Sequence, residues 1–278
     1  MKKVRNLMFL CVAMMAACMI QSKDVQATEV GKYEMSDTKS YSKYDVTGDG
    51  VPDTVKFEKQ LDDDGYSYNA FKVIINGKTA LYGDNVYFYT LKPVLIQTEG
   101  HQYILISLVG DNDDETKKIY KYVDGQLKEC ADLDEYVSKI YFHSSVTISS
   151  VSTSSITFKV TGQTYMLART NMSFVYKVGA TGELSLADEV TKVTYTKDRV
   201  NSRRSYKSKY LVAAKKIQAY SSATGSKKAF RMKKGTKLKI TKVSVQGKTP
   251  RYYCITKSGK KGWVNSKMGL FKDMPYAG

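Results

Sequence analysis

The sequence predicts an all-β protein, with an N-terminal β-sheet domain and a small C-terminal β-barrel. Short apolar or alternating runs rich in Val, Ile, Tyr, Phe and Thr recur along residues 28–198 and again along residues 210–272. These residue types fit a pleated, half-buried surface. Turn pairs such as Asp49-Gly50, Asn76-Gly77 and Asp124-Gly125 separate the runs and are typical of hairpins. No stretch keeps a helical period for long, although Ala131–Tyr136 can form one short helical turn.

The strands expected in the N-terminal domain are Val55–Phe57, Phe71–Ile75, Val86–Tyr89, Val94–Ile96, Tyr103–Val109, Ile119–Val123, Ile140–Phe142, Val146–Ile148, Ile156–Val160, Phe174–Val178 and Val190–Tyr195. A weak internal repeat runs through them. Ile119–Leu127 matches Val175–Leu184 at an offset of 56–57 residues, and Phe71–Gly77 is a degenerate third copy. Each copy predicts one hairpin of a small sheet, so the domain is either a set of blade-like repeats or a sandwich. Chance recurrence of hairpin chemistry is the alternative.

The strands expected in the C-terminal domain are Leu211–Ala214, Lys216–Tyr220, Phe230–Met232, Lys237–Val245, Arg251–Thr256 and Gly262–Val264. So many short strands in a segment this small predict a barrel. Three stretches in it, Met232–Ile240, Tyr252–Ile255 and Gly259–Ser266, resemble the bacterial SH3-like (SH3b) domain of secreted wall proteins. They repeat its Lys-Lys-Gly-Thr turn, its aromatic strand and its Gly-x-x-Gly-Trp-Val-x-Ser ending. The resemblance implies an SH3-like barrel that attaches the protein to the cell wall.

Aromatic and basic side chains form the candidate ligand site of this domain. Trp263 either packs at the rim of a small core or forms one wall of a ligand groove together with Tyr220 and Tyr252 or Tyr253, because aromatic rings stack on peptide and sugar faces. Tyr220 stands where the SH3b family has Arg. The candidate anion contacts are Lys227, Lys228, Lys233, Lys234, Lys260 and Lys261.

The net charge of +17 is concentrated at one end of the chain. Residues 199–278 hold 22 basic residues and one acidic residue, whereas residues 28–198 hold 18 basic and 25 acidic residues. Like charges destabilise a compact domain, so such an excess predicts an anionic partner rather than an ordinary solvated face. The basic, Ser-rich residues 199–209 are the expected linker between the two domains.

The first segment predicts export. Residues 1–27 combine a basic start, a run of fourteen apolar residues over Leu7–Ile20 and small residues before a cleavage point after Ala27, as in a secretory signal peptide. The run spans about 21 Å as a helix, too short for a bilayer core of about 30 Å. Two alternatives stay open, an uncleaved anchor and a lipoprotein signal cleaved before Cys18. After cleavage no stable membrane span is expected, and export argues against a nucleic-acid partner.

An acidic loop is the sharpest motif of the N-terminal domain. Asp45, Thr47, Asp49, the carbonyl of Val51 and Asp53 fall at alternate positions around Gly50, the spacing of oxygens that Ca²⁺ prefers. The run resembles the calcium loops of repeat families in bacterial surface proteins. It departs at Thr47, where those families have Asp or Asn, and no Glu closes the loop. The sequence therefore predicts weak calcium binding, with a solvated hairpin turn as the alternative.

No motif points to catalysis. His101 and His143 stand apart, so a zinc amidase lacks its ligands. Cys130 lacks the surrounding residues of a papain-like wall peptidase. We predict a binding protein that is secreted and held at the cell wall or outside it, with peptidoglycan or a teichoic-type anionic polymer as partner and an unknown ligand for its N-terminal display or recognition domain. The alternatives are a wall hydrolase or other secreted enzyme with its active site in residues 28–198, and a scaffold or adhesin for a protein partner.

Overall fold

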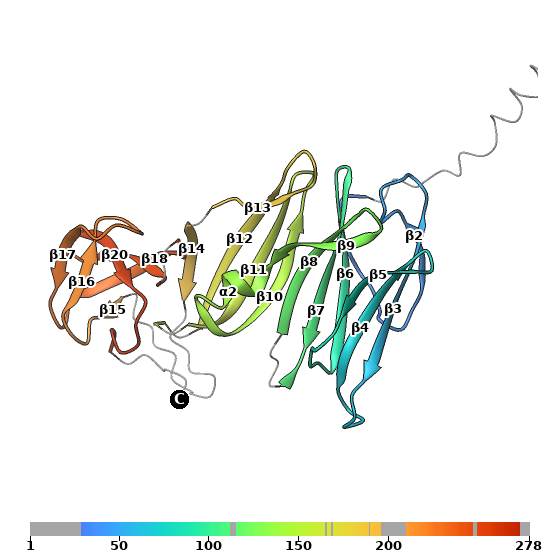
Figure 1. Cartoon of the computed structure of the whole chain (residues 1–278). Helices are drawn as coiled ribbons and strands as arrows, with labels where there is room; N and C mark the ends of the chain where they lie inside the picture. The colour runs from blue at the N-terminus through green and yellow to red at the C-terminus, as the bar shows by residue number, and fades with distance from the viewer. Residues whose placement is uncertain are drawn as a thin grey trace, which may run out of the picture.

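The computed structural model confirms the all-β fold, whose only helix among the described residues is one short turn (Figure 1). The structure describes residues 29–111, 115–164, 166–167, 169–188, 190–195, 210–246 and 249–272. The expected signal segment 1–27 and the expected linker 199–209 lie outside the described residues. No helix in the described ranges is long and apolar enough to cross a membrane.

Three antiparallel sheets form the first part of the chain. The first sheet has the order β2-β3-β4-β5, the second β1-β6-β7-β8-β9, and the third begins β10-β11-β12-β14, with β13 paired to β12. The strands of the first sheet are β2 (Tyr41–Tyr44), β3 (Asp53–Leu61), β4 (Tyr68–Ile75) and β5 (Lys78–Gly83). Those of the second are β1 (Gly31–Glu34), β6 (Thr90–Thr98), β7 (His101–Val109), β8 (Glu115–Val123) and β9 (Gln126–Asp132). The short helix α2 (Leu133–Val137) leads to the third, with β10 (Tyr141–Val151), β11 (Ser155–Thr164), β12 (Arg169–Val178), β13 (Leu184–Leu186) and β14 (Val190–Tyr195).

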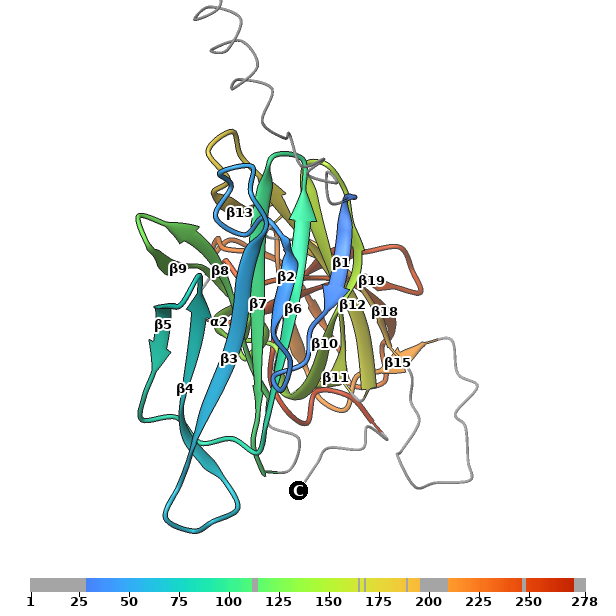
Figure 2. The same ribbon diagram turned by 90° about the vertical axis from the view of Figure 1, so that its right-hand side faces the viewer.

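The sheets stack face to face along one axis, with the C-terminal part at the far end (Figures 1 and 2). The second sheet is therefore covered on both faces. Leu95 and Ile104 pack into the core shared with the first sheet, while their neighbours Ile96 and Tyr103 pack into the core shared with the third. Because both faces are buried, β6 and β7 have nearly continuous apolar sequences rather than an alternating pattern.

The three repeat copies occupy equivalent places. Each is the hairpin that follows the second strand of a four-strand meander, namely β4–β5, β8–β9 and β12–β13. In the first two hairpins the turn pairs Asn76-Gly77 and Asp124-Gly125 all have positive φ, as the tight turns of right-twisted hairpins require. The repeat therefore corresponds to a recurring structural unit, an antiparallel meander that ends in a hairpin.

The C-terminal strands form an open sheet with the order β15-β18-β19-β20-β16-β17. They are β15 (Leu211–Val212), β16 (Ile217–Tyr220), β17 (Lys228–Met232), β18 (Lys237–Ser244), β19 (Arg251–Thr256) and β20 (Lys261–Asn265). Within the described ranges no pairing joins β17 to β18, so the strands do not close into a barrel. The edge of β18 opposite β19 pairs with β15 at one end and with β14 at the other. The third sheet thus continues into the C-terminal sheet, and one hydrophobic core runs from β6 to β20.

Candidate ligand-binding surface

Six side chains form a row across six neighbouring strands, β14, β18, β19, β20, β16 and β17. Each is the direct cross-strand partner of the next, and directly opposed residues project from the same face of a sheet. In order, the members of this cross-strand row are Lys192, Lys242, Tyr253, Trp263, Tyr220 and Lys228. The row spans about 24 Å along the sheet, from five inter-strand spacings of about 4.8 Å. Three aromatic rings thus lie in the middle, with lysines at both ends.

The aromatic centre of the row is held in place by its neighbours. The rings of Tyr253 and Trp263 have centroids 5.2 Å apart and planes tilted by 57°. The Arg251 guanidinium lies 4.3 Å from the centre of the Tyr220 ring, a favourable cation–π geometry. Arg251 also donates hydrogen bonds to the carbonyl oxygens of Ser222 and Gly225 at 3.1 and 2.6 Å. The ring of Tyr220 and the loop that follows it are therefore fixed by one side chain.

Gly262 makes the close approach of β16 to β20 possible. A Cβ atom at this position would lie 3.0 Å from the carbonyl oxygen of Tyr220 and 3.1 Å from both Ala219 and Phe230. Such contacts are tighter than a packed interior normally allows. The glycine before Trp263 is thus a packing requirement that sets Tyr220 directly opposite Trp263.

Tyr252 does not belong to this surface, which corrects the sequence prediction. Its side chain is fully buried in the core shared with the third sheet, and this burial raises the pKa of the Tyr252 hydroxyl. Successive residues of a strand point to opposite faces. Only one of Tyr252 and Tyr253 can therefore face outward, and it is Tyr253.

The predicted lysines are all exposed, but they do not form one cluster. Lys228 belongs to the row, and Lys261 projects from the same face two residues before Trp263. Lys227 precedes Lys228, and the Lys260 ammonium lies 6.0 Å from the Phe230 ring centre. The remaining two, Lys233 and Lys234, lie in the turn after the opposite end of β17.

Sequence reasoning missed Lys192 and Lys242. Each is one of many lysines in a strand pattern, and nothing local distinguishes it. Their membership in the row depends on β14 pairing with β18, a contact between residues far apart in the sequence.

The acidic loop uses its first carboxylates to hold its own backbone. The Asp45 carboxylate accepts hydrogen bonds from the N–H groups of residues 48–50 at 2.7, 3.2 and 2.8 Å. Asp49 accepts one from the Val51 N–H at 2.8 Å. Gly48 and Gly50 have positive φ, as a backbone coiled around a carboxylate needs.

Asp53, at the far end of the loop, is buried. One carboxylate oxygen accepts from the N–H groups of Val46 and Thr47 at 2.6 and 2.7 Å, and the other accepts from the Asn76 amide at 2.6 Å and the Thr47 hydroxyl at 3.3 Å. Across the described ranges, no three His, Cys, Asp or Glu side chains converge as metal ligands. Calcium binding by this loop stays a prediction.

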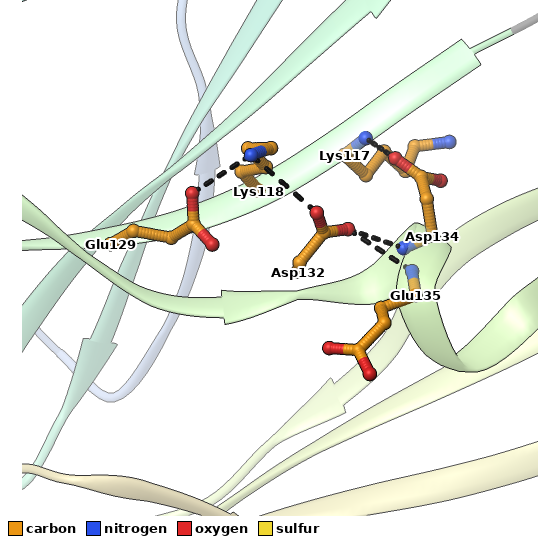
Figure 3. Close-up of polar contacts among 6 residues, drawn as sticks. All are labelled: Lys117, Lys118, Glu129, Asp132, Asp134 and Glu135. Carbon is orange, nitrogen blue, oxygen red and sulfur yellow. Dashed lines mark hydrogen bonds and ion pairs between the residues drawn. The ribbon is translucent and has the colours of Figure 1, made fainter.

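A second charged cluster lies at the junction of β8, β9 and α2 (Figure 3). The Asp132 carboxylate accepts from the N–H groups of Asp134 and Glu135 at 2.9 and 3.2 Å and so caps α2. Asp134 accepts from the Lys117 N–H at 2.6 Å. The pKa of Asp134 is raised to about 6, chiefly by burial; the hydrogen bond from the Lys117 N–H opposes this shift, and the nearby charge of Asp132 adds to it. The paired Lys117 is itself buried, and this burial lowers the pKa of its ammonium.

Every charge in this cluster has an opposite charge or a hydrogen-bond donor beside it. Lys117 pairs with Glu115, and Lys118 pairs with Glu129 and Asp132 at 2.9 and 3.5 Å. We interpret it as a structural network that fixes α2 against the second sheet.

No protein-family model, curated protein or solved structure matches this chain.

Proposed function

We propose that this protein is an exported, envelope-associated binding protein whose cross-strand row binds peptidoglycan or a teichoic-type anionic polymer. The observation that supports this proposal is the order of the row, with three aromatic rings between lysines on one sheet face. Aromatic faces stack on sugars and peptides, and Lys ammonium groups pair with phosphates and carboxylates. The stacked N-terminal sheets then serve as a recognition or display module for an unknown ligand.

The proposal is for binding rather than hydrolysis. Among the residues that the structure describes, a groove of about 910 Å³ on the third sheet is lined by one carboxylate, Asp188, whereas paired-carboxylate glycosidases need two. Purified wall embedded in a gel should therefore stay intact around the renatured protein, although the same protein binds the wall in solution. A cleared zone would support the hydrolase alternative.

Co-sedimentation with purified cell walls tests the proposal, using the full chain from residue 28. Replacing Tyr253 and Trp263 with Ala should reduce the bound fraction, because it removes the rings that stack on the ligand. Tyr82→Ala is the matched control, since Tyr82 is an exposed aromatic on the first sheet. Equal loss in the control, or no loss in the row variant, would contradict the proposal.

The charge at the ends of the row is tested in the same assay. Binding should weaken with rising salt and after removal of the anionic polymer from the wall, because exposed charge interactions are screened. Replacing Lys228 and Lys242 with Gln should weaken binding more than replacing Lys233 and Lys234 in the turn outside the row. Binding that ignores salt would contradict the electrostatic part of the proposal.

A further inference from the structure

The groove of about 910 Å³ opens where β14 changes its hydrogen-bonding partner. β14 pairs with β12 through residues 193–195 and with β18 through residues 190–192. Past Met172 the two strands β12 and β14 therefore separate. The Thr191 hydroxyl crosses the opening and donates a hydrogen bond to the Ser173 carbonyl. The groove is thus a consequence of the topology, with a polar link across it.

The described lining of this groove combines basic and polar side chains with apolar ones, namely Met172, Phe174, Val175 and Val190. Its charged residues, within the described ranges, are three lysines, Lys159, Lys192 and Lys242, and one carboxylate, Asp188. None of the three lysines forms an ion pair with any residue that the structure describes. The uncharged hydrogen-bonding side chains around them are Asn171, Ser173, Thr191 and Thr194.

Two features favour an anionic occupant. Lys192 and Lys242 are direct cross-strand partners, and like charges in that position destabilise a sheet unless something neutralises them. The side-chain oxygen of Asn171 accepts a hydrogen bond from the Thr161 hydroxyl at 2.7 Å. The side-chain NH₂ group of Asn171 is therefore the group that can donate hydrogen bonds to a ligand. An acceptor-rich anion suits both features.

The cations of the groove are suited to phosphate. The ammonium group of lysine binds phosphate as a compact point charge, and the basic residues among the described lining are all lysines. Its volume is within the range of ligand sites, about 300–1,000 Å³. Lys192 and Lys242 also belong to the cross-strand row, so a chain held in the groove continues onto the aromatic rings.

We propose that this groove is the phosphate-binding part of the surface and that it takes a chain of units joined by phosphodiesters. The inference rests on the proposed function and names its ligand class. Lys159 belongs to the groove alone and Trp263 to the row alone, so their variants separate the two claims.

Calorimetric titration of the full chain from residue 28 tests the inference. The probe is a short synthetic chain of glycerol units joined by phosphodiesters. Replacing Lys159, Lys192 and Lys242 with Gln should weaken binding by about tenfold or more, since charge-assisted hydrogen bonds are lost. Lys159→Gln alone should weaken binding by a smaller factor and reduce its salt dependence. Lys177→Gln is the matched control, because Lys177 is an exposed residue of β12 outside the groove.

Two further titrations identify the source of the phosphate. Inorganic phosphate should bind more weakly than the synthetic chain, because only a chain can place several phosphates in the groove at once. Binding of the protein to phosphatidylglycerol vesicles should be equally strong in the wild type and in Lys159→Gln. Binding of the vesicles but not of the chain through Lys159 would overturn the inference in favour of a lipid headgroup.

Chain binding that is unchanged in both the Lys159 variant and the triple variant would also overturn the inference. The proposed function would still stand if the Tyr253 and Trp263 variant lost the wall. Conversely, a row variant that keeps full wall binding would contradict the proposed function whatever the groove does.

Discussion

Trp263 is the single tryptophan of the chain, and both of its neighbours in the row are tyrosines. Its side chain is half-buried and its ring packs against the Tyr253 ring, with 5.2 Å between the ring centroids. Packing and partial exposure, the two alternatives that the sequence leaves open, are therefore combined in one residue. A ring fixed in this way loses little conformational entropy when a ligand stacks on it.

Replacing Trp263 with Ala should weaken wall binding by about tenfold or more, as for a central aromatic anchor. Trp263→Phe should retain part of the affinity, because a flat face remains. Tyr252→Phe is the control for packing, since the Tyr252 side chain is fully buried and its loss of a hydroxyl should change stability but not affinity. Unfolding of Trp263→Ala in circular dichroism, with the affinity of Trp263→Phe unchanged from wild type, would favour a purely structural role.

Asp134 makes a pH-dependent contribution to stability. Because burial raises the folded-state pKa of its carboxyl to about 6, above the ordinary value, the folded state binds a proton more tightly than the unfolded state. The stabilising contribution of this proton is present in full at low pH and is lost as the pH rises through about 6.

The free energy of unfolding of Asp134→Asn, relative to that of the wild type, should therefore increase as the pH rises from about 4.5 to about 7. The expected increase is about 1–2 kcal/mol after allowance for partial exposure. The asparagine oxygen can still accept the hydrogen bond from the Lys117 N–H. Urea unfolding of both proteins at the two pH values measures the difference. A difference between the two proteins that is the same at both pH values would contradict this account.

The acidic loop illustrates how one element can serve folding, ligand binding or both. Asp53→Ala should lower the free energy of unfolding by about 3 kcal/mol, because buried N–H groups lose their acceptor. Asp49→Ala should cost less than about 1 kcal/mol, because this exposed carboxylate accepts one hydrogen bond. Asp49→Ala is thus the variant that tests the metal without disrupting the loop.

If the loop binds Ca²⁺, adding calcium should raise the melting temperature of the wild type, and Asp49→Ala should reduce that shift. A wild-type transition that calcium leaves unchanged would show that the loop is only a turn.

The sequence predicts best those strands in which apolar and polar residues alternate strictly and a turn follows. Arg251–Thr256 forms a strand with the predicted bounds, because every second residue is buried. Val86–Tyr89 does not form a strand, and its only β-type pairing within the described ranges is the isolated bridge between Tyr68 and Phe88. Its apolar residues fill the end of the first core instead. The N-terminal strand β1 was missed because its short polar sequence, Gly31–Glu34, carries no apolar pattern.

The candidate site was only partly predictable for a related reason. Tyr253 and Trp263 lie on the consecutive strands β19 and β20, so hairpin spacing brings them together, whereas Tyr220 meets Trp263 only because β16 pairs with the distant strand β20. Lys192 joins them only because β14 leaves β12 for β18. A change of partner between distant strands leaves no signal in the local pattern.

At the scale of the whole molecule, the two expected domains share a core. The buried residues Phe158 of β11, Val193 of β14 and Tyr252 of β19 belong to one hydrophobic cluster. Separating the C-terminal sheet would expose this cluster to water, so the third sheet and the C-terminal sheet should unfold together.

Trp263 emission and far-ultraviolet circular dichroism should therefore give the same midpoint in urea. Emission reports the C-terminal sheet alone, since the chain has no other tryptophan, whereas circular dichroism reports all sheets. An emission midpoint well below the circular dichroism midpoint would show that the C-terminal sheet is an independent domain.

The central claim is that the cross-strand row is the binding surface, and Trp263 provides the most direct measurement of it. Solubilised wall fragments are titrated into the full chain from residue 28 while its tryptophan emission is recorded. The account predicts a saturable change in emission whose midpoint equals the dissociation constant from co-sedimentation, with both weakened together in the Lys228 and Lys242 variant. Full wall binding with no change in Trp263 emission would contradict the account, because the ligand would then lie elsewhere on the molecule.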